Sequence, residues 1–299
     1  MLRPILVVSA ALVSVSAFAA DLGTKKPSPV AAVSAACKET KGLPADVFGF
    51  ATGSDVADLG AWGIALDTAG AAGTRGGSGY TLAPTVQVSG SFLPCLEVGP
   101  YGFLSYTNFK PYGGGLATKT NVFGGGIEIK YKLLGRAPHG IGLTFAVSPN
   151  FASSDTSPGT NFSQFGNSYR LLADMELIKD KLYGALNLEL FQTMPNNTPT
   201  LNSSVLAVRA ALATPITDAI FVGAEVSHQR AYTGAWANRY VANATYIGPT
   251  FFWQVSEKFS LNGTWAYQVA GESRVSPGRA LGIDNFSRHL GRLKLGYAF

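Results

Sequence analysis

Charged residues are scarce in this chain. Asp, Glu, Lys and Arg make up 14% of its 299 residues, and the formal net charge is only +5. The basic residues form no cluster, so the sequence disfavours nucleic-acid binding. Long apolar runs are lacking too. Although 46% of the residues are hydrophobic, no run reaches the ~20 residues that a membrane helix needs. This composition predicts apolar residues spaced singly along alternating strands.

Cysteine and chemical motifs are also sparse. The sequence contains only Cys37 and Cys95, and an exported chain permits one disulfide between them, with two free thiols as the alternative. No metal-ligand spacing, phosphate loop or nucleotide fingerprint is present. The sequence therefore predicts no metal, no cofactor and no catalytic residue.

The first sixty residues divide into two parts. Arg3, the apolar run that follows and the small-x-small pattern at Ala17–Ala19 predict a signal peptide over residues 1–19, with the mature chain beginning at Ala20. Residues 20–60 have no sustained period and contain Pro and many small residues, which argues against a helical domain. This stretch is expected to form a periplasmic arm or a plug.

Residues 61–299 alternate between apolar and polar positions in about twelve runs. In residues 181–191, Leu186 and Leu188 share one face, while Asn187 and Glu189 share the other. The connections alternate between short turns and long loops, which a Greek-key sandwich does not require. The pattern predicts a transmembrane antiparallel up-and-down β-barrel of about twelve strands, with ten or fourteen left open. Backbone groups cannot stay unpaired in lipid, so the last strand must pair with the first.

The last stretch, residues 286–299, is the most regular. Leu293, Leu295, Tyr297 and Phe299 lie on one face, and the chain ends on an aromatic residue. This terminal strand resembles the C-terminal signature of Gram-negative outer-membrane β-barrels. The resemblance implies an outer-membrane location, and it implies that Tyr297 and Phe299 form the signal that the barrel-assembly machinery recognises. On the resulting topology Cys95 falls at the periplasmic rim, on the same side as Cys37.

The inward face carries similar numbers of acids and bases. The expected lumen-lining charges are Glu97, Glu128, Lys130, Lys132, Arg170, Asp174, Glu176, Glu189, Arg209, Glu225, Arg288, Arg292 and Lys294. In a water-filled pore, opposed charges create a transverse field that sets selectivity. In a filled barrel, the same residues neutralise one another. The first interpretation predicts a narrow channel for passive passage of small solutes, and the second a sealed structural or surface-interaction barrel.

Two further hypotheses concern the faces of the barrel. Apolar residues at inward positions allow a transporter of small hydrophobic compounds, with ordinary filling of the interior as the alternative: Tyr101, Phe103, Leu172, Phe191, Phe221 and Phe252. Ser287 and His289 share the outward face, but their order and the lack of an orienting group disfavour a lipid-hydrolysing enzyme.

The predicted external loops are more basic than acidic. Such a rim would face lipopolysaccharide phosphates. The expected partners are therefore outer-membrane lipid and lipopolysaccharide, the assembly machinery and small solutes. The sequence does not indicate an oligomeric state.

Overall fold

The protein is a closed antiparallel β-barrel. The computed structural model describes residue 43 and residues 46–113, 117–157, 162–196 and 202–299, so the predicted signal peptide and Cys37 lie outside the described residues. The barrel strands are β1 (Trp62–Ala72), β2 (Gly77–Leu93), β3 (Leu96–Pro111), β4 (Thr118–Leu134), β5 (Ile141–Ser157), β6 (Phe162–Ile178), β7 (Leu182–Pro195), β8 (Ser203–Thr217), β9 (Ile220–Thr233), β10 (Arg239–Gln254), β11 (Phe259–Ser273) and β12 (His289–Ala298).

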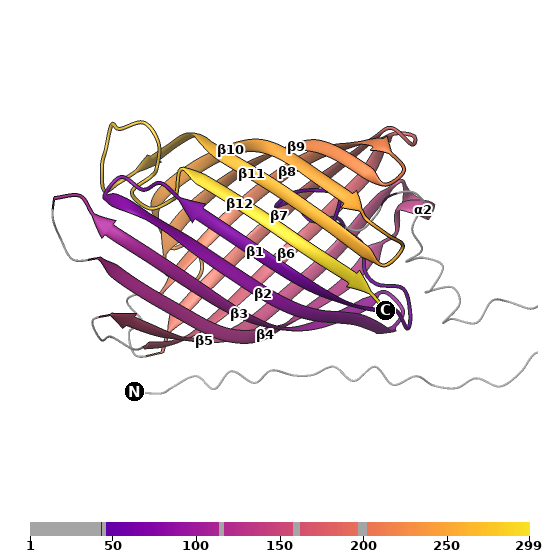
Figure 1. Ribbon diagram of the computed structural model, residues 1–299, viewed down its shortest axis with the longest axis horizontal. Helices are drawn as coiled ribbons and strands as arrows, with labels where there is room; N and C mark the ends of the chain where they lie inside the picture. Colours follow the sequence, from indigo (N-terminus) through magenta and orange to yellow (C-terminus); the bar gives the residue numbers. More distant parts are fainter. Residues whose placement is uncertain (1–42, 44–45, 114–116, 158–161, 197–201) are drawn as a thin grey trace, which may run out of the picture.

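Each strand pairs with its neighbours in sequence, and β12 closes the barrel on β1 (Figure 1). The closing register places Leu66 opposite Leu295 and Asp67 opposite Lys294. The twelve-stranded count and the pairing of the last strand with the first are thus confirmed. The weakly patterned β1 is retained because closure leaves no edge strand, and an unpaired edge is not tolerated in hydrocarbon.

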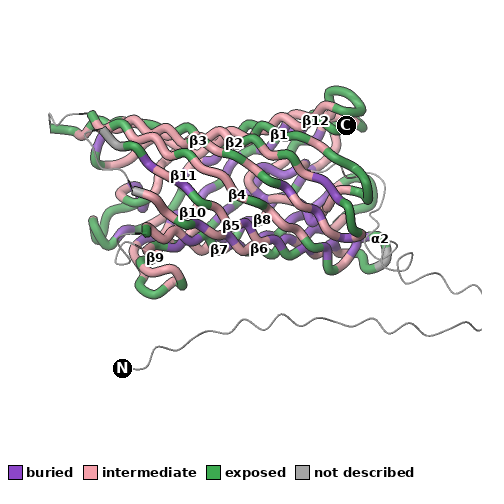
Figure 2. Tube along the Cα trace, turned by 90° about the horizontal axis from the view of Figure 1, so that it is seen from below, coloured by how far each residue is buried: buried purple, intermediate pink, exposed green. Residues whose placement is uncertain are grey.

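The two faces of the wall follow the alternation in the sequence (Figure 2). On β7, Leu186 and Leu188 are 55% and 47% exposed on the outside, whereas Asn187 between them is fully buried inside. Aromatic residues cluster toward both ends of the outer wall, with Trp62 stacked on Phe92 at one end and Trp265 on His289 at the other. An apolar outer band between aromatic belts matches a wall that faces lipid.

The connections at one end of the barrel are tight, and we refer to it as the turn end. They include Pro94 and Cys95 between β2 and β3, and a one-turn helix, α2 (Arg136–His139), between β4 and β5. The start of β1 and the end of β12 also lie at this end. No helix in the described part of the chain is long and apolar enough to cross a membrane.

At the opposite loop end, the expectation of long loops is largely wrong. Residues 68–79, expected as a loop, are mostly strand: β1 runs to Ala72 and β2 starts at Gly77. The alternation of apolar and polar residues indicates only the part of a strand whose outer face meets lipid. The strands continue past that part, where polar residues occur on both faces. The longest described connection, residues 274–288, remains between β11 and β12.

Candidate functional site

The N-terminal residues 46–58, here called the lumen segment, lie inside the barrel near the turn end. Their contacts follow the strands around the wall in reverse order. Asp46 pairs with Lys294 on β12, Ala51 contacts Glu225 on β9, and Ala57 contacts Glu97 on β3. The segment therefore runs around the inner circumference of the barrel.

The wall holds the segment mainly through its backbone. The Ala51 amide donates to a Glu225 carboxylate oxygen at 2.8 Å. The Asn187 Oδ1 atom accepts a hydrogen bond from the Thr52 amide at 2.6 Å, and the Asn187 Nδ2 atom donates to the Thr52 carbonyl at 2.8 Å. On the other side of the lumen, Asn262 Nδ2 donates to two carbonyl oxygens of the segment, each at 2.7 Å. Buried backbone groups need such partners, and inward polar side chains supply them.

The densest polar cluster surrounds Ser54. Asp174 on β6 accepts the Ser54 amide at 2.6 Å and the Ser54 hydroxyl at 2.9 Å. Arg136 of α2 donates to Asp174 at 2.6 Å and to both oxygens of Asp55 at 2.8 Å. Lys132 also pairs with Asp55 at 3.0 Å. Charge-assisted bonds of this length are stronger than neutral ones, so this cluster is a main anchor of the lumen segment.

An apolar contact anchors the other half of the segment. Val47, Phe48 and Ala51 are each 1% exposed. They pack against inward residues of β7 to β10, including Phe221 and Phe252, whose rings lie 6.1 Å apart. These two predicted apolar lumen positions thus face a segment of the same chain.

Beside the segment, the lumen keeps a polar cavity of about 240 Å³. Its wall comes from β1 to β7 and β12, with Asp46 and Thr52 of the segment forming part of its boundary. Arg292 donates to Asp67 at 2.5 Å, and Lys130 pairs with Glu97 at 3.1 Å and with Glu128 at 3.3 Å. Acids and bases therefore stand close together around this small cavity.

The structure places most of the predicted lumen charges on the inner wall, and each of these has a charged or backbone partner: Glu97, Glu128, Lys130, Lys132, Arg170, Asp174, Glu189, Arg209, Glu225, Arg292 and Lys294. Two predicted members lie apart. Glu176 accepts the Asp180 amide in the β6–β7 turn at 2.5 Å. Arg288 lies one residue before β12 at the loop end, where its amide donates to the Gly73 carbonyl, and its place on the lumen wall stays a prediction.

The remaining predicted residues lie at the ends of the barrel. Cys95 is 7% exposed in the β2–β3 turn, and its pairing with Cys37 stays a prediction. Tyr297 and Phe299 are 42% and 68% exposed on the outer face at the turn end, and their role in assembly stays a prediction as well. The ring of His289 lies 5.2 Å from that of Tyr267.

Sequence reasoning missed the contacts of the lumen segment. It placed Asn187 on the inward face without a partner, and it left out the acids Asp46 and Asp55 of the segment and the turn residue Arg136. Residues 46–58 carry no periodic pattern, and their partners lie up to 248 positions away. The inward position of polar wall residues such as Asn187 and Asp174 was an available signal.

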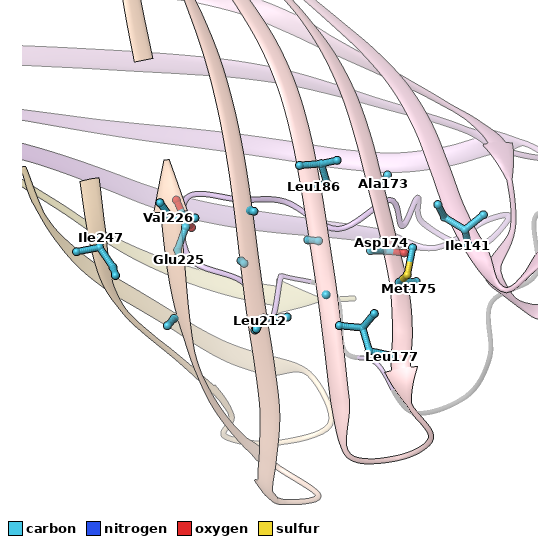
Figure 3. Close-up of a pocket in the computed structure, with 15 residues that line it drawn as sticks. Ile141, Ala173, Asp174, Met175, Leu177, Leu186, Leu212, Glu225, Val226 and Ile247 are labelled. Atoms are coloured by element: carbon cyan, nitrogen blue, oxygen red, sulfur yellow. The ribbon is translucent and has the colours of Figure 1, made fainter. Parts of the chain in front are cut away.

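A second hollow, of about 530 Å³, lies in the barrel wall and is mostly apolar. Outward residues such as Leu186, Leu212 and Val226 line it, across β5 to β10 (Figure 3). Asp174 and Glu225 belong to the same strands, but their carboxylates bind the lumen segment on the inner side. This apolar hollow is thus separate from the polar cavity in the lumen.

Two ionisable groups at the anchor have shifted pKa values. Burial raises the pKa of the Asp55 carboxyl to about 6, against the opposing effect of Arg136. Burial alone would lower the pKa of the Arg136 guanidinium, but the carboxylates of Asp55 and Asp174 outweigh it and raise that pKa. Docking of the segment is thus coupled to protonation of Asp55.

Solved structures of outer-membrane barrels share this architecture. The β domain of the Bordetella autotransporter BrkA has a TM-score of 0.56 at 10% identity, covering 80% of this chain and 98% of that domain. An outer-membrane channel from Pseudomonas putida F1 has a TM-score of 0.55 at 12% identity, covering 86% and 99%. The translocator domain of NalP from Neisseria meningitidis has a TM-score of 0.51 at 14% identity, covering 81% and 90%.

The fold is therefore that of outer-membrane β-barrels, here with a segment of the same chain bound inside the turn end. The model of DUF6662, a family of unknown function, matches residues 44–299, and the chain belongs to that family. No curated protein matches the sequence. The family match includes the lumen segment as well as the barrel.

Proposed function

We propose that this protein is an outer-membrane channel for passive passage of small polar solutes, and that the lumen segment controls its opening. The turn end then faces the periplasm and the loop end faces the exterior, as in barrels with short periplasmic turns. The path runs through the charged cavity bounded by Asp67, Glu128 and Arg170.

The polar character of the inner wall around the lumen segment supports this proposal. Buried ion pairs stabilise a fold less than well-packed apolar residues of similar volume, so a permanently sealed barrel gains little from Asp174, Glu225 or Lys294. Water can satisfy the same donors and acceptors once the segment leaves. The polar wall is therefore suited to bind either the lumen segment or water.

Current recordings across planar bilayers test the proposal on the purified, refolded protein. We expect discrete openings with a defined ion selectivity. If Cys37 is bonded to Cys95, that link holds the chain before the segment against the periplasmic rim, and a reductant is expected to raise the open probability. Silence with and without reductant would favour the sealed structural barrel.

Acidification is expected to favour the closed state. The pKa of Asp55 is about 6 with the segment docked and near the ordinary ~3.9 when it is hydrated. The docked form therefore binds the proton more tightly, so docking strengthens as the pH falls from 7 toward 4. Open probability at pH 5 should lie below that at pH 7, and Asp55→Asn should weaken this dependence. A higher open probability at pH 5 in the wild type would contradict this coupling.

A further inference from the structure

A cluster of arginine and tyrosine residues lies at the loop end of the outer wall. This rim cluster comprises Arg230 and Tyr232 of β9, Tyr240 of β10, and Arg274, which follows β11. The Arg230 guanidinium lies 5.0 Å from the centre of the Tyr240 ring and 5.8 Å from that of Tyr232. The Arg274 guanidinium lies 5.4 Å from the Tyr240 ring. Both cations thus stack on one tyrosine.

The cluster faces the membrane rather than the lumen. Arg230 shares the exposed face of β9 with Val222 and Val226. It lies ten positions beyond Ile220 at the turn end, and with a rise of ~3.3 Å per residue and a tilt of ~40° this spans roughly 25 Å, the height of the apolar band. The guanidinium groups therefore lie where hydrocarbon gives way to headgroups.

The two arginines of this cluster form no direct ion pair with another described residue. Among the described residues, neither Arg230 nor Arg274 pairs with a carboxylate, and both are exposed. The nearby Glu272 accepts from the Tyr240 hydroxyl at 2.6 Å. Elsewhere on the same rim, Arg75 pairs with Asp284 at 3.1 Å. Arg230 and Arg274 thus differ from Arg75, whose charge is paired within the protein.

A change of register brings these residues together. The pairing of β9 with β10 shifts between Tyr240 and Ala242, which sets Tyr240 opposite Tyr232 and Asn243 opposite Arg230. Bulges of this kind re-aim side chains near functional sites. The tyrosines supply amphipathic surface at the headgroup level, and the arginines supply donors that match phosphate geometry.

We propose that the rim cluster binds a phosphate group of the lipid A portion of lipopolysaccharide. This inference rests on the outer-membrane location proposed above, but not on the passage of solutes. We expect lipid A because its phosphates lie in the outer leaflet, at the height of Arg230 and beside the lipid-facing wall. The cation–tyrosine stack holds the guanidinium groups in place before the lipid arrives.

Lipid retention by the full-length refolded protein tests the site. Vesicles of phosphatidylcholine would contain diphosphoryl lipid A, lipid A lacking phosphate, or phosphatidylglycerol, and bound lipid would be counted by native mass spectrometry. The double variant Arg230→Gln/Arg274→Gln should reduce retention of diphosphoryl lipid A about tenfold or more, given the strength of paired charge-assisted bonds. Arg279→Gln is the matched control, since Arg279 is an exposed loop cation outside the cluster.

The outcomes separate the two proposals. Loss confined to the double variant and to diphosphoryl lipid A supports the site. Equal retention of phosphatidylglycerol, an equal loss in Arg279→Gln, or no loss in the double variant would overturn it. Folding of each variant is checked by heat-modifiable migration on gels. Channel currents are recorded separately, and we expect them to be unchanged by Arg230→Gln/Arg274→Gln, so failure of the channel proposal would leave this result interpretable.

Discussion

Replacement of Asp174 by alanine is expected to open the channel. Asp174 is 2% exposed and binds both Ser54 and Arg136. Its removal leaves the Ser54 amide without its acceptor and takes one carboxylate from a buried cation. Asp174 accepts its two bonds from Ser54 only in the docked state, and a hydrogen bond to a charged group contributes about 1.5–3 kcal/mol. The loss of these bonds falls on the docked state, so the ratio of open to closed channel should rise about tenfold to a hundredfold.

Single-channel recording measures this ratio directly. The control is Glu176→Gln on the same strand, because Glu176 shares the inward face but accepts the Asp180 amide of the β6–β7 turn rather than a group of the lumen segment. It should behave as the wild type. Limited proteolysis near residues 46–58 should become faster in Asp174→Ala only. If Asp174→Ala formed a stable barrel with wild-type currents, the anchoring role of this cluster would be wrong.

Arginine placed at two adjacent positions of β7 should have opposite consequences. Leu188→Arg puts a cation on the lipid face near mid-membrane and should reduce the free energy of insertion by about 2–4 kcal/mol. Asn187→Arg puts it into the lumen, where Asn187 is fully buried against Thr52. The larger side chain leaves no room for the segment. We expect this variant to insert normally with the segment displaced and the current increased.

Urea titration of the protein folded into vesicles measures the first effect, and bilayer currents measure the second. The two variants carry the same charge at neighbouring positions, so each is the control for the other. Similar insertion defects in both would mean that the faces of β7 are assigned wrongly. Normal insertion of Asn187→Arg without a change in current would mean that the segment does not limit passage.

The barrel itself was predictable because lipid imposes a strict rule on the wall. Outward positions within the hydrocarbon are mostly apolar and every backbone group there must be paired, so alternation alone located Leu186, Leu188 and Tyr297 on the outer face. The pairing of β12 with β1 followed from closure, even though β1 is weakly patterned.

The candidate site was predictable only on its wall side. The inward position of Asp174 and Glu225 follows from the alternation of their strands, but their partners belong to an aperiodic stretch. Hydrogen bonds to the backbone of residues 51–54 depend on chain path rather than on side-chain type. No local pattern encodes such contacts, so the sequence supported both an arm and a plug.

Control of passage by the lumen segment is tested by the current through a full-length chain in which residues 46–58 are replaced by a Gly-Ser stretch of equal length. The wall strands pair with one another, so the barrel should still close, which heat-modifiable migration on gels would verify. We expect long openings, a higher mean current than in the wild type, and an open probability that no longer depends on pH between 7 and 5. A folded variant whose current matches that of the wild type would contradict the claim that the lumen segment controls passage.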